Sequence, residues 1–162
     1  MTQITDAQSL IDLLTRLDDQ LDGLDQLLEQ EQTALVENQF PDIERIAAEK
    51  SQLTEQVEQS EQARHKLCQQ LQISPDFEGI RRYVTTLAQR QRQAIVQRWE
   101  SIIVRGQRCA SQNQLNGILV ANQQRRTREA LAILRGNGTS SESYSHSGAH
   151  QQEQMVHSLG KV

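Results

Sequence analysis

The chain contains four histidines and two cysteines, residue types that can bind a metal or act as nucleophiles. His146 and His150 stand four residues apart, a spacing that would place both on one face of a helix and would suit zinc. They lie in a stretch rich in Gly and Ser, so we interpret them as solvated side chains. Cys68 and Cys109 have no ligand partners at metal-binding spacing and are too few for a disulfide framework. We predict that both thiols are reduced core residues and that no metal is bound.

Motifs of the common enzyme classes are absent from the sequence. It contains no phosphate-binding loop, nucleophile elbow, Rossmann glycine pattern or helical zinc-protease motif. Hydrophobic residues make up 36% of the chain and aromatic residues 3%, a composition that favours long helices with narrow apolar seams over a core with a deep pocket. No run of about 18 apolar residues is present, so direct membrane insertion is not expected. We predict a binding protein without catalytic activity or cofactor.

Charge is distributed unevenly along the chain. Residues 1 to 73 contain 15 acidic and 5 basic residues, whereas residues 80 to 135 contain 11 arginines and only two acidic residues. The arginines could bind the phosphates of a nucleic acid. They could also pair with the acidic half of the same chain. Aromatic residues that could stack on bases are scarce, which favours the second interpretation.

Two heptad repeats dominate the acidic half. Leucine recurs at alternating spacings of four and three residues from Leu10 to Leu35, and Ile, Val and Leu continue the pattern from Ile43 to Leu71. Pro41 lies between the repeats, where it ends the first helix and suits the first turn of the second. The sequence therefore predicts helices at about residues 6–38 and 41–72, joined by a tight reversal into an antiparallel hairpin.

The two repeats also predict the register of this hairpin. In an antiparallel pair the numbers of facing residues have a constant sum, and a sum of 81 aligns both repeats. That sum places Leu28 opposite Leu53. It also places Glu31, the charged residue of the first repeat, opposite Lys50 of the second. We predict an ion pair at this layer that fixes the register, because a slip would set a charge against a leucine.

A third helix is predicted at about residues 75–135. Ser74 is the expected N-cap of this helix, and Gly136 is expected to end it. Its apolar seam begins at Ile95, but after Ile102 small and polar residues replace the large apolar ones. The pattern leaves open whether this helix packs on the hairpin or exchanges with another molecule.

The predicted fold class is all-α, a long antiparallel coiled-coil hairpin plus a third long helix, followed by a disordered C-terminal tail. Residues 1–135 are expected to form one helical domain. Residues 136–162 are rich in Gly, Ser, Gln and His and are predicted to be flexible. The seams are also compatible with a homo-oligomer.

Four short motifs resemble those of a known family. They read Leu27-Leu28-x-x-Glu31-x-x-x-Leu35, Ile43-x-x-Ile46-x-x-x-Lys50, Asn113-x-x-Asn116-Gly117 and Tyr144-x-x-x-Gly148. Together, over the range Leu10 to Gly148, they are similar to the FlgN family of flagellar export chaperones. The resemblance implies a cytoplasmic protein that binds hook-filament junction proteins, also called hook-associated proteins. It would deliver them to the flagellar type III export gate for flagellum assembly.

The resemblance also implies which residues bind these partners. The family's substrate-binding region corresponds to the last part of the third predicted helix, and the candidates there are Asn113, Asn116, Leu119, Val120, Gln123, Thr127, Leu131 and Leu134. The family's tail tyrosine, associated with docking to the export gate, corresponds to Tyr144. Neither ATP nor a metal is implied.

Two other functions are compatible with the same sequence. A general coiled-coil adaptor or oligomerisation module would use the heptad seams alone. A nucleic-acid binder would use the arginine-rich third helix, and its affinity would fall steeply with salt.

Overall fold

The computed structural model describes residues 2–136, with side chains from residue 6 onward, and shows four helices there. They are α1 (Thr2–Glu37), α2 (Phe40–Gln70), α3 (Phe77–Val84) and α4 (Gln89–Leu134). Over this part of the chain no residue lies in a strand, so the predicted all-α class is confirmed. The described residues divide into two units, one that ends at Arg125 and one that begins at Arg126 and includes the last turns of α4. None of the four helices has an apolar stretch long enough to cross a bilayer.

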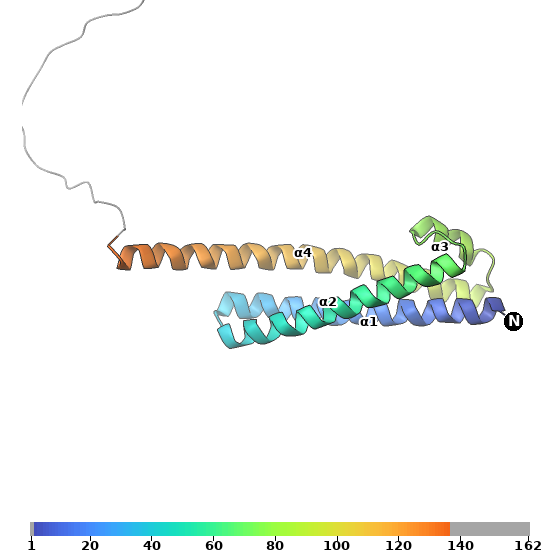
Figure 1. Ribbon diagram of the computed structural model, residues 1–162, viewed down its shortest axis with the longest axis horizontal. Helices are drawn as coiled ribbons and strands as arrows, with labels where there is room; N and C mark the ends of the chain where they lie inside the picture. Colours follow the sequence, from blue (N-terminus) through green and yellow to red (C-terminus); the bar gives the residue numbers. More distant parts are fainter. Residues whose placement is uncertain (1, 137–162) are drawn as a thin grey trace, which may run out of the picture. The chain divides into compact units, whose positions relative to one another are not determined.

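Helices α1 and α2 form the predicted antiparallel hairpin (Figure 1). Asn38 turns the chain in a left-handed backbone conformation with φ 56°, which asparagine tolerates better than most residues. The amide of Gln39 then donates to the carbonyl oxygen of Ala34 at 2.9 Å, and Pro41 occupies the first turn of α2. Proline suits that turn because the amides there have no partner within the helix.

The predicted register holds at the charged layer of the hairpin. Lys50 Nζ lies 2.6 Å from Glu31 Oε1, so the predicted ion pair is confirmed. Leu53 departs from the prediction, because its Cδ2 atom lies 3.2 Å from where a Cβ on Gly23 would be. Gly23 lies five residues nearer to the start of α1 than the predicted partner Leu28. Gly23 has no side chain and leaves room for Leu53. The prediction paired leucines with leucines and took no account of this space.

The apolar core of the first unit lies along α1. It joins leucines of the first heptad repeat to residues of the other three helices, and its buried members are Ala7, Leu10, Leu14, Leu17, Leu21, Cys68, Ile80, Val84, Leu87, Ile95, Trp99 and Ile102. Cys109 is buried further along α4. Both cysteines are free, as predicted, and burial raises the pKa of each thiol, so the protonated, unreactive form is favoured.

The single third helix predicted at residues 75–135 is wrong, because the chain breaks between α3 and α4. The hydroxyl groups of Thr85 and Thr86 donate to the carbonyl oxygens of Arg82 and Tyr83, which ends α3. Arg92, in the first turns of α4, donates to three carbonyl oxygens around this break, those of Val84, Thr85 and Leu87. The predicted end of the third helix is correct, because Gly136 follows α4 with φ 72° and donates its amide to the Ile133 carbonyl oxygen.

The N-cap of α3 is Asp76 and not the predicted Ser74. The Asp76 carboxylate accepts the amide of Gly79 at 2.7 Å, and this bond lowers the pKa of the carboxyl group. Ser74 instead places its carbonyl oxygen against Gly79, only 2.1 Å from where a Cβ would be. The close approach of the backbone therefore requires glycine at position 79.

A buried arginine holds α2, α4 and the loop before α3 together. Arg64 is 5% exposed, and its guanidinium carbon lies 4.8 Å from the centre of the Trp99 ring. It also donates to the carbonyl oxygen of Pro75 and to Glu61, each at 2.7 Å. The charge is paired and hydrogen-bonded, as burial requires.

Candidate protein-binding site

Helix α4 runs parallel to α1 in the first unit, because its contacts keep a constant offset in residue number. One line of polar contacts joins Arg98 to Thr15, Ser101 to Asp18, Arg105 to Asp22 and Arg108 to Asp25. Arg105 and Arg108 each reach a second acid as well, Asp18 and Glu29. These α4 arginines therefore pair with the chain's own acidic helix, which is the second interpretation of the charge asymmetry.

A second line of contacts joins the inner face of α4 to the backbone of α1. Three α4 side chains, each seven residues after the last, donate to three α1 carbonyl oxygens with the same spacing. The pairs are Cys109 to Leu21 at 3.6 Å, Asn116 to Leu28 at 2.9 Å, and Gln123 to Leu35. The small and polar seam residues of the sequence are thus hydrogen-bond donors to a neighbouring helix. Beside them, only Leu119 and Val120 among the large apolar side chains of α4 from Cys109 to Gln123 are half-buried.

Asn116 is the centre of this arrangement. It is 1% exposed, and besides the Leu28 carbonyl oxygen its Nδ2 atom reaches Glu31 Oε2 at 2.8 Å. Glu31 thereby accepts from both Lys50 and Asn116. Asn113 lies on the exposed side of the same layer, with its Oδ1 atom 3.4 Å from Lys50 Nζ.

The two asparagines of the Asn-x-x-Asn-Gly motif should therefore differ in their effect on stability. Asn116→Ala removes two buried hydrogen bonds and leaves one oxygen of the Glu31 carboxylate without its donor, so we expect a loss of about 1 to 3 kcal/mol. Asn113→Ala removes one long, exposed contact and should change stability by less than about 0.5 kcal/mol. Urea denaturation of both variants measures the difference, and equal midpoints would contradict the assigned contacts.

The two halves of α4 in the first unit are held in different ways. Ile95, Trp99 and Ile102 are all buried, and burying such side chains contributes about 1.5 to 3 kcal/mol each. Beyond Ile102 the contacts are mainly hydrogen bonds and exposed ion pairs, whose net contributions are about 0.5 to 1.5 and about 0 to 1 kcal/mol each. Gly106 and Gly117 weaken this half of the helix by a further ~1 kcal/mol each relative to alanine.

The predicted substrate-binding residues differ in how far the structure buries them. Asn116 is buried, and Leu119, Val120 and Gln123 are half-buried in the first unit, whereas Asn113 is exposed there. In the second unit Thr127, Leu131 and Leu134 are exposed. Tyr144 and the tail histidines lie outside the described residues.

Sequence analysis missed the exposed apolar residues of α4 that lie outside the seam. Leu115 and Ile118 are 50% and 51% exposed and, three residues apart, share one face of the helix. Val104 is exposed on the same side. A search for apolar residues out of phase with the seam would have found them, because a surface helix with no partner usually places polar residues there.

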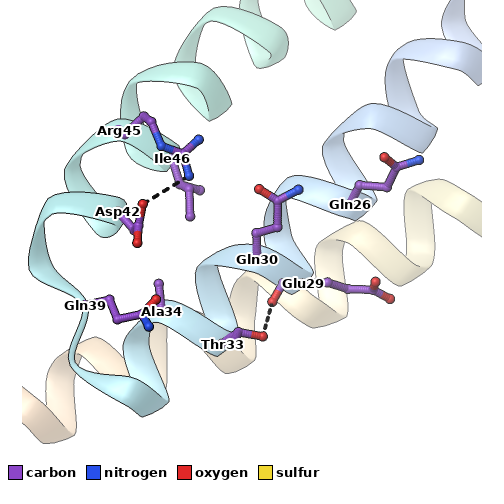
Figure 2. A pocket seen from close by; sticks show the side chains of 9 residues that line it. All are labelled: Gln26, Glu29, Gln30, Thr33, Ala34, Gln39, Asp42, Arg45 and Ile46. Carbon is purple, nitrogen blue, oxygen red and sulfur yellow. Dashed lines mark hydrogen bonds and ion pairs between the residues drawn. The ribbon is translucent and has the colours of Figure 1, made fainter.

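An open, polar pocket of about 500 Å³ lies between α1 and α2 near their turn (Figure 2). Its charged side chains are occupied with their own neighbours, because Arg45 pairs with Asp42 and Glu49, and Glu29 pairs with Arg108. The other polar side chains are Gln26, Gln30, Thr33 and Gln39. None of these residues is an activated nucleophile. Among the described residues no group of His, Cys, Asp and Glu could hold a metal ion.

Comparison with known protein families shows the family to which the chain belongs. A family model described as FlgN protein matches residues 1–152 of the 162 residues. The comparison with curated proteins and the comparison with solved structures each found no significant match. Because the family match covers almost the whole chain, including all four helices, the protein belongs to the FlgN family of flagellar export chaperones.

Proposed function

We propose that this protein is a cytoplasmic chaperone that binds hook-filament junction proteins and delivers them to the flagellar type III export gate. The observation that best supports the proposal is the exposure of large apolar side chains on α4 within each unit. They are Val104, Leu115 and Ile118 in the first unit and Leu131, Ile133 and Leu134 in the second. Exposed apolar side chains in such number mark a surface for a protein partner. An amphipathic helix of the substrate could dock there by its apolar face.

The proposed substrate-binding residues lie on α4 from Asn113 to Leu134. Leu131 and Leu134 are exposed, so a substrate can reach them. In the first unit, Leu115 and Ile118 are exposed apolar residues of α4 that the sequence did not suggest. A chaperone must release its substrate at the gate, and an interface of this kind can supply micromolar affinity, roughly −8 kcal/mol, without irreversible burial.

The proposed docking residue for the export gate is Tyr144. Its role rests on the family resemblance, and Tyr144→Ala should leave substrate binding unchanged while export of the substrate falls. A secretion assay beside a binding assay separates these two effects, and a variant that loses binding would assign Tyr144 to the substrate site instead.

Leucine substitutions on α4 test the proposed site. Leu131→Ala together with Leu134→Ala removes exposed apolar area, so affinity for a purified terminal fragment of a junction protein should fall by about 1 to 3 kcal/mol while unfolding is barely changed. Leu14→Ala is the matched control. It empties part of the buried core and should cost about 2 to 5 kcal/mol of stability, with affinity retained at temperatures where the variant is folded. Fluorescence anisotropy with the fragment gives the affinities, and unchanged binding by the α4 variant would reject this site.

A further inference from the structure

The part of α4 from Cys109 to Gln123 carries proposed binding residues that α1 already covers. Asn116 is buried and Gln123 half-buried, and both donate to carbonyl oxygens of α1. A substrate cannot contact these inner residues while the two helices are together. Either the inner residues take no part in binding, or this half of α4 separates from α1.

The contacts themselves favour separation. The carbonyl oxygens of Leu21 and Leu28 lie within the continuous helix α1 and already accept an amide of their own helix. They need no donor from α4. Glu31 keeps its partner Lys50 when Asn116 leaves, and the side chains of Asn116 and Gln123 can bind water instead. Opening therefore leaves no buried polar group unsatisfied on α1. On α4 it exposes mainly polar groups, and on α1 it uncovers Leu21, Leu28 and Leu35, which are buried in the closed state and become available to a partner.

The other half of α4 does not share this property. Ile95, Trp99 and Ile102 are buried in the core, and Trp99 is covered by Arg64. Separation there would expose large apolar surface. Gly106 lies at the junction between the two halves, and because glycine weakens a helix interior, a bend costs least at that point.

From these contacts we infer that the half of α4 from Cys109 to Gln123 is a latch that opens from α1 and admits an amphipathic helix between the two. One side of that helix meets the leucines of α1 at positions 21, 28 and 35, which are buried in the closed state. Its other side meets Asn116, Val120 and Gln123 of α4. The partner is thus a helix with an apolar stripe at heptad spacing and a polar edge. This inference rests on the proposed chaperone function and specifies how that function uses α4.

A covalent link across the latch tests the inference. Asn38 and Gln123 hydrogen-bond at 3.0 Å at the far end of the latch, so Asn38→Cys with Gln123→Cys can be joined by a short bismaleimide. The chain also carries Cys109→Ser, because opening of the latch would expose that thiol, while Cys68 stays buried. Asp18→Cys with Ser101→Cys, joined by the same reagent, is the matched control, because that pair lies in the half of α4 held by the core. The probe is the purified terminal fragment of a junction protein.

We expect the link at positions 38 and 123 to weaken binding of the fragment by at least about tenfold relative to the same variant without the link. The link at positions 18 and 101 should change binding little. Equal affinity with and without the first link would overturn the latch but leave the proposed function standing. Failure of the fragment to bind the unlinked chain would count against the proposed function.

Hydrogen exchange of the free chain tests, without any substrate, whether the latch opens. Amides from residue 109 to 121 should exchange at least about tenfold faster than amides from residue 95 to 102, because local opening precedes unfolding of the core. The same protection in both stretches would show that α4 opens only when the whole bundle unfolds, and the latch would then be wrong.

Discussion

Replacing Gly79 with alanine is expected to destabilise the bundle by about 3 kcal/mol. The new Cβ would lie 2.1 Å from the Ser74 carbonyl oxygen and 2.6 Å from the Ser74 Cβ, so the backbone of the loop before α3 would have to move. That movement would also pull the Gly79 amide away from its cap, Asp76. Guanidinium denaturation, with the midpoint as readout, measures the loss.

The matched control is Gly106→Ala. Gly106 lies inside α4 with nothing within 4 Å of the position of its Cβ, so alanine adds no clash and raises helix propensity by ~1 kcal/mol. The two glycine substitutions should therefore shift stability in opposite directions. A Gly79→Ala variant as stable as the unchanged chain would show that the loop before α3 does not lie where the structure places it.

The charge reversal Glu31→Lys is expected to destabilise the hairpin by about 3 to 4 kcal/mol. Glu31 is 6% exposed, and the reversal would set two ammonium groups together at a layer where Asn116 also presents its donor. Thermal or chemical denaturation measures the loss.

The double variant Glu31→Lys with Lys50→Glu should recover most of that loss, because it restores an opposite pair. The Asn116 side chain can turn its oxygen toward the new ammonium group. The difference between the double variant and the sum of the single variants gives the coupling energy. Independent, additive effects would show that residues 31 and 50 do not face each other in solution.

The hairpin could be predicted from the sequence because the same heptad pattern occurs in both of its helices. Two heptads had to agree in phase, and a single charge in the first, Glu31, had to meet an opposite charge in the second, Lys50. The position of Leu53 could not be predicted in the same way. Leu53 occupies space that Gly23 leaves because it has no side chain, and the heptad pattern records only where large apolar residues recur.

The break between α3 and α4 and the docking of α4 were beyond the sequence for a different reason. Thr85 and Thr86 are acceptable in a helix. The end of α3 shows only in the structure, where the amides of Thr85, Thr86 and Leu87 bond to carbonyl oxygens three residues back and the hydroxyl groups of the two threonines reach the same oxygens as their amides. The polar seam of α4 looked like a weakened coiled coil. Its donors fit a backbone on a neighbouring helix, and that geometry depends on the parallel direction of α1 and α4, which the pattern left open.

The candidate site was predicted in part. The family resemblance pointed to the stretch from Asn113 to Leu134, and the exposed Leu131 and Leu134 there are suited to binding. It did not distinguish the inner residues Asn116 and Gln123, which contact α1, from exposed residues that a substrate can reach directly. That distinction requires the three-dimensional arrangement of α1 and α4.

The proposed chaperone function is tested most directly by a calorimetric titration of the 162-residue chain with purified terminal fragments of hook-filament junction proteins. The proposed function predicts saturable binding with a Kd of about 1 µM or tighter, which corresponds to roughly −8 kcal/mol. It also predicts that a chain ending at Arg135 keeps this affinity, because the binding residues lie on α4. No detectable heat of binding with any fragment at about 100 µM would contradict the account.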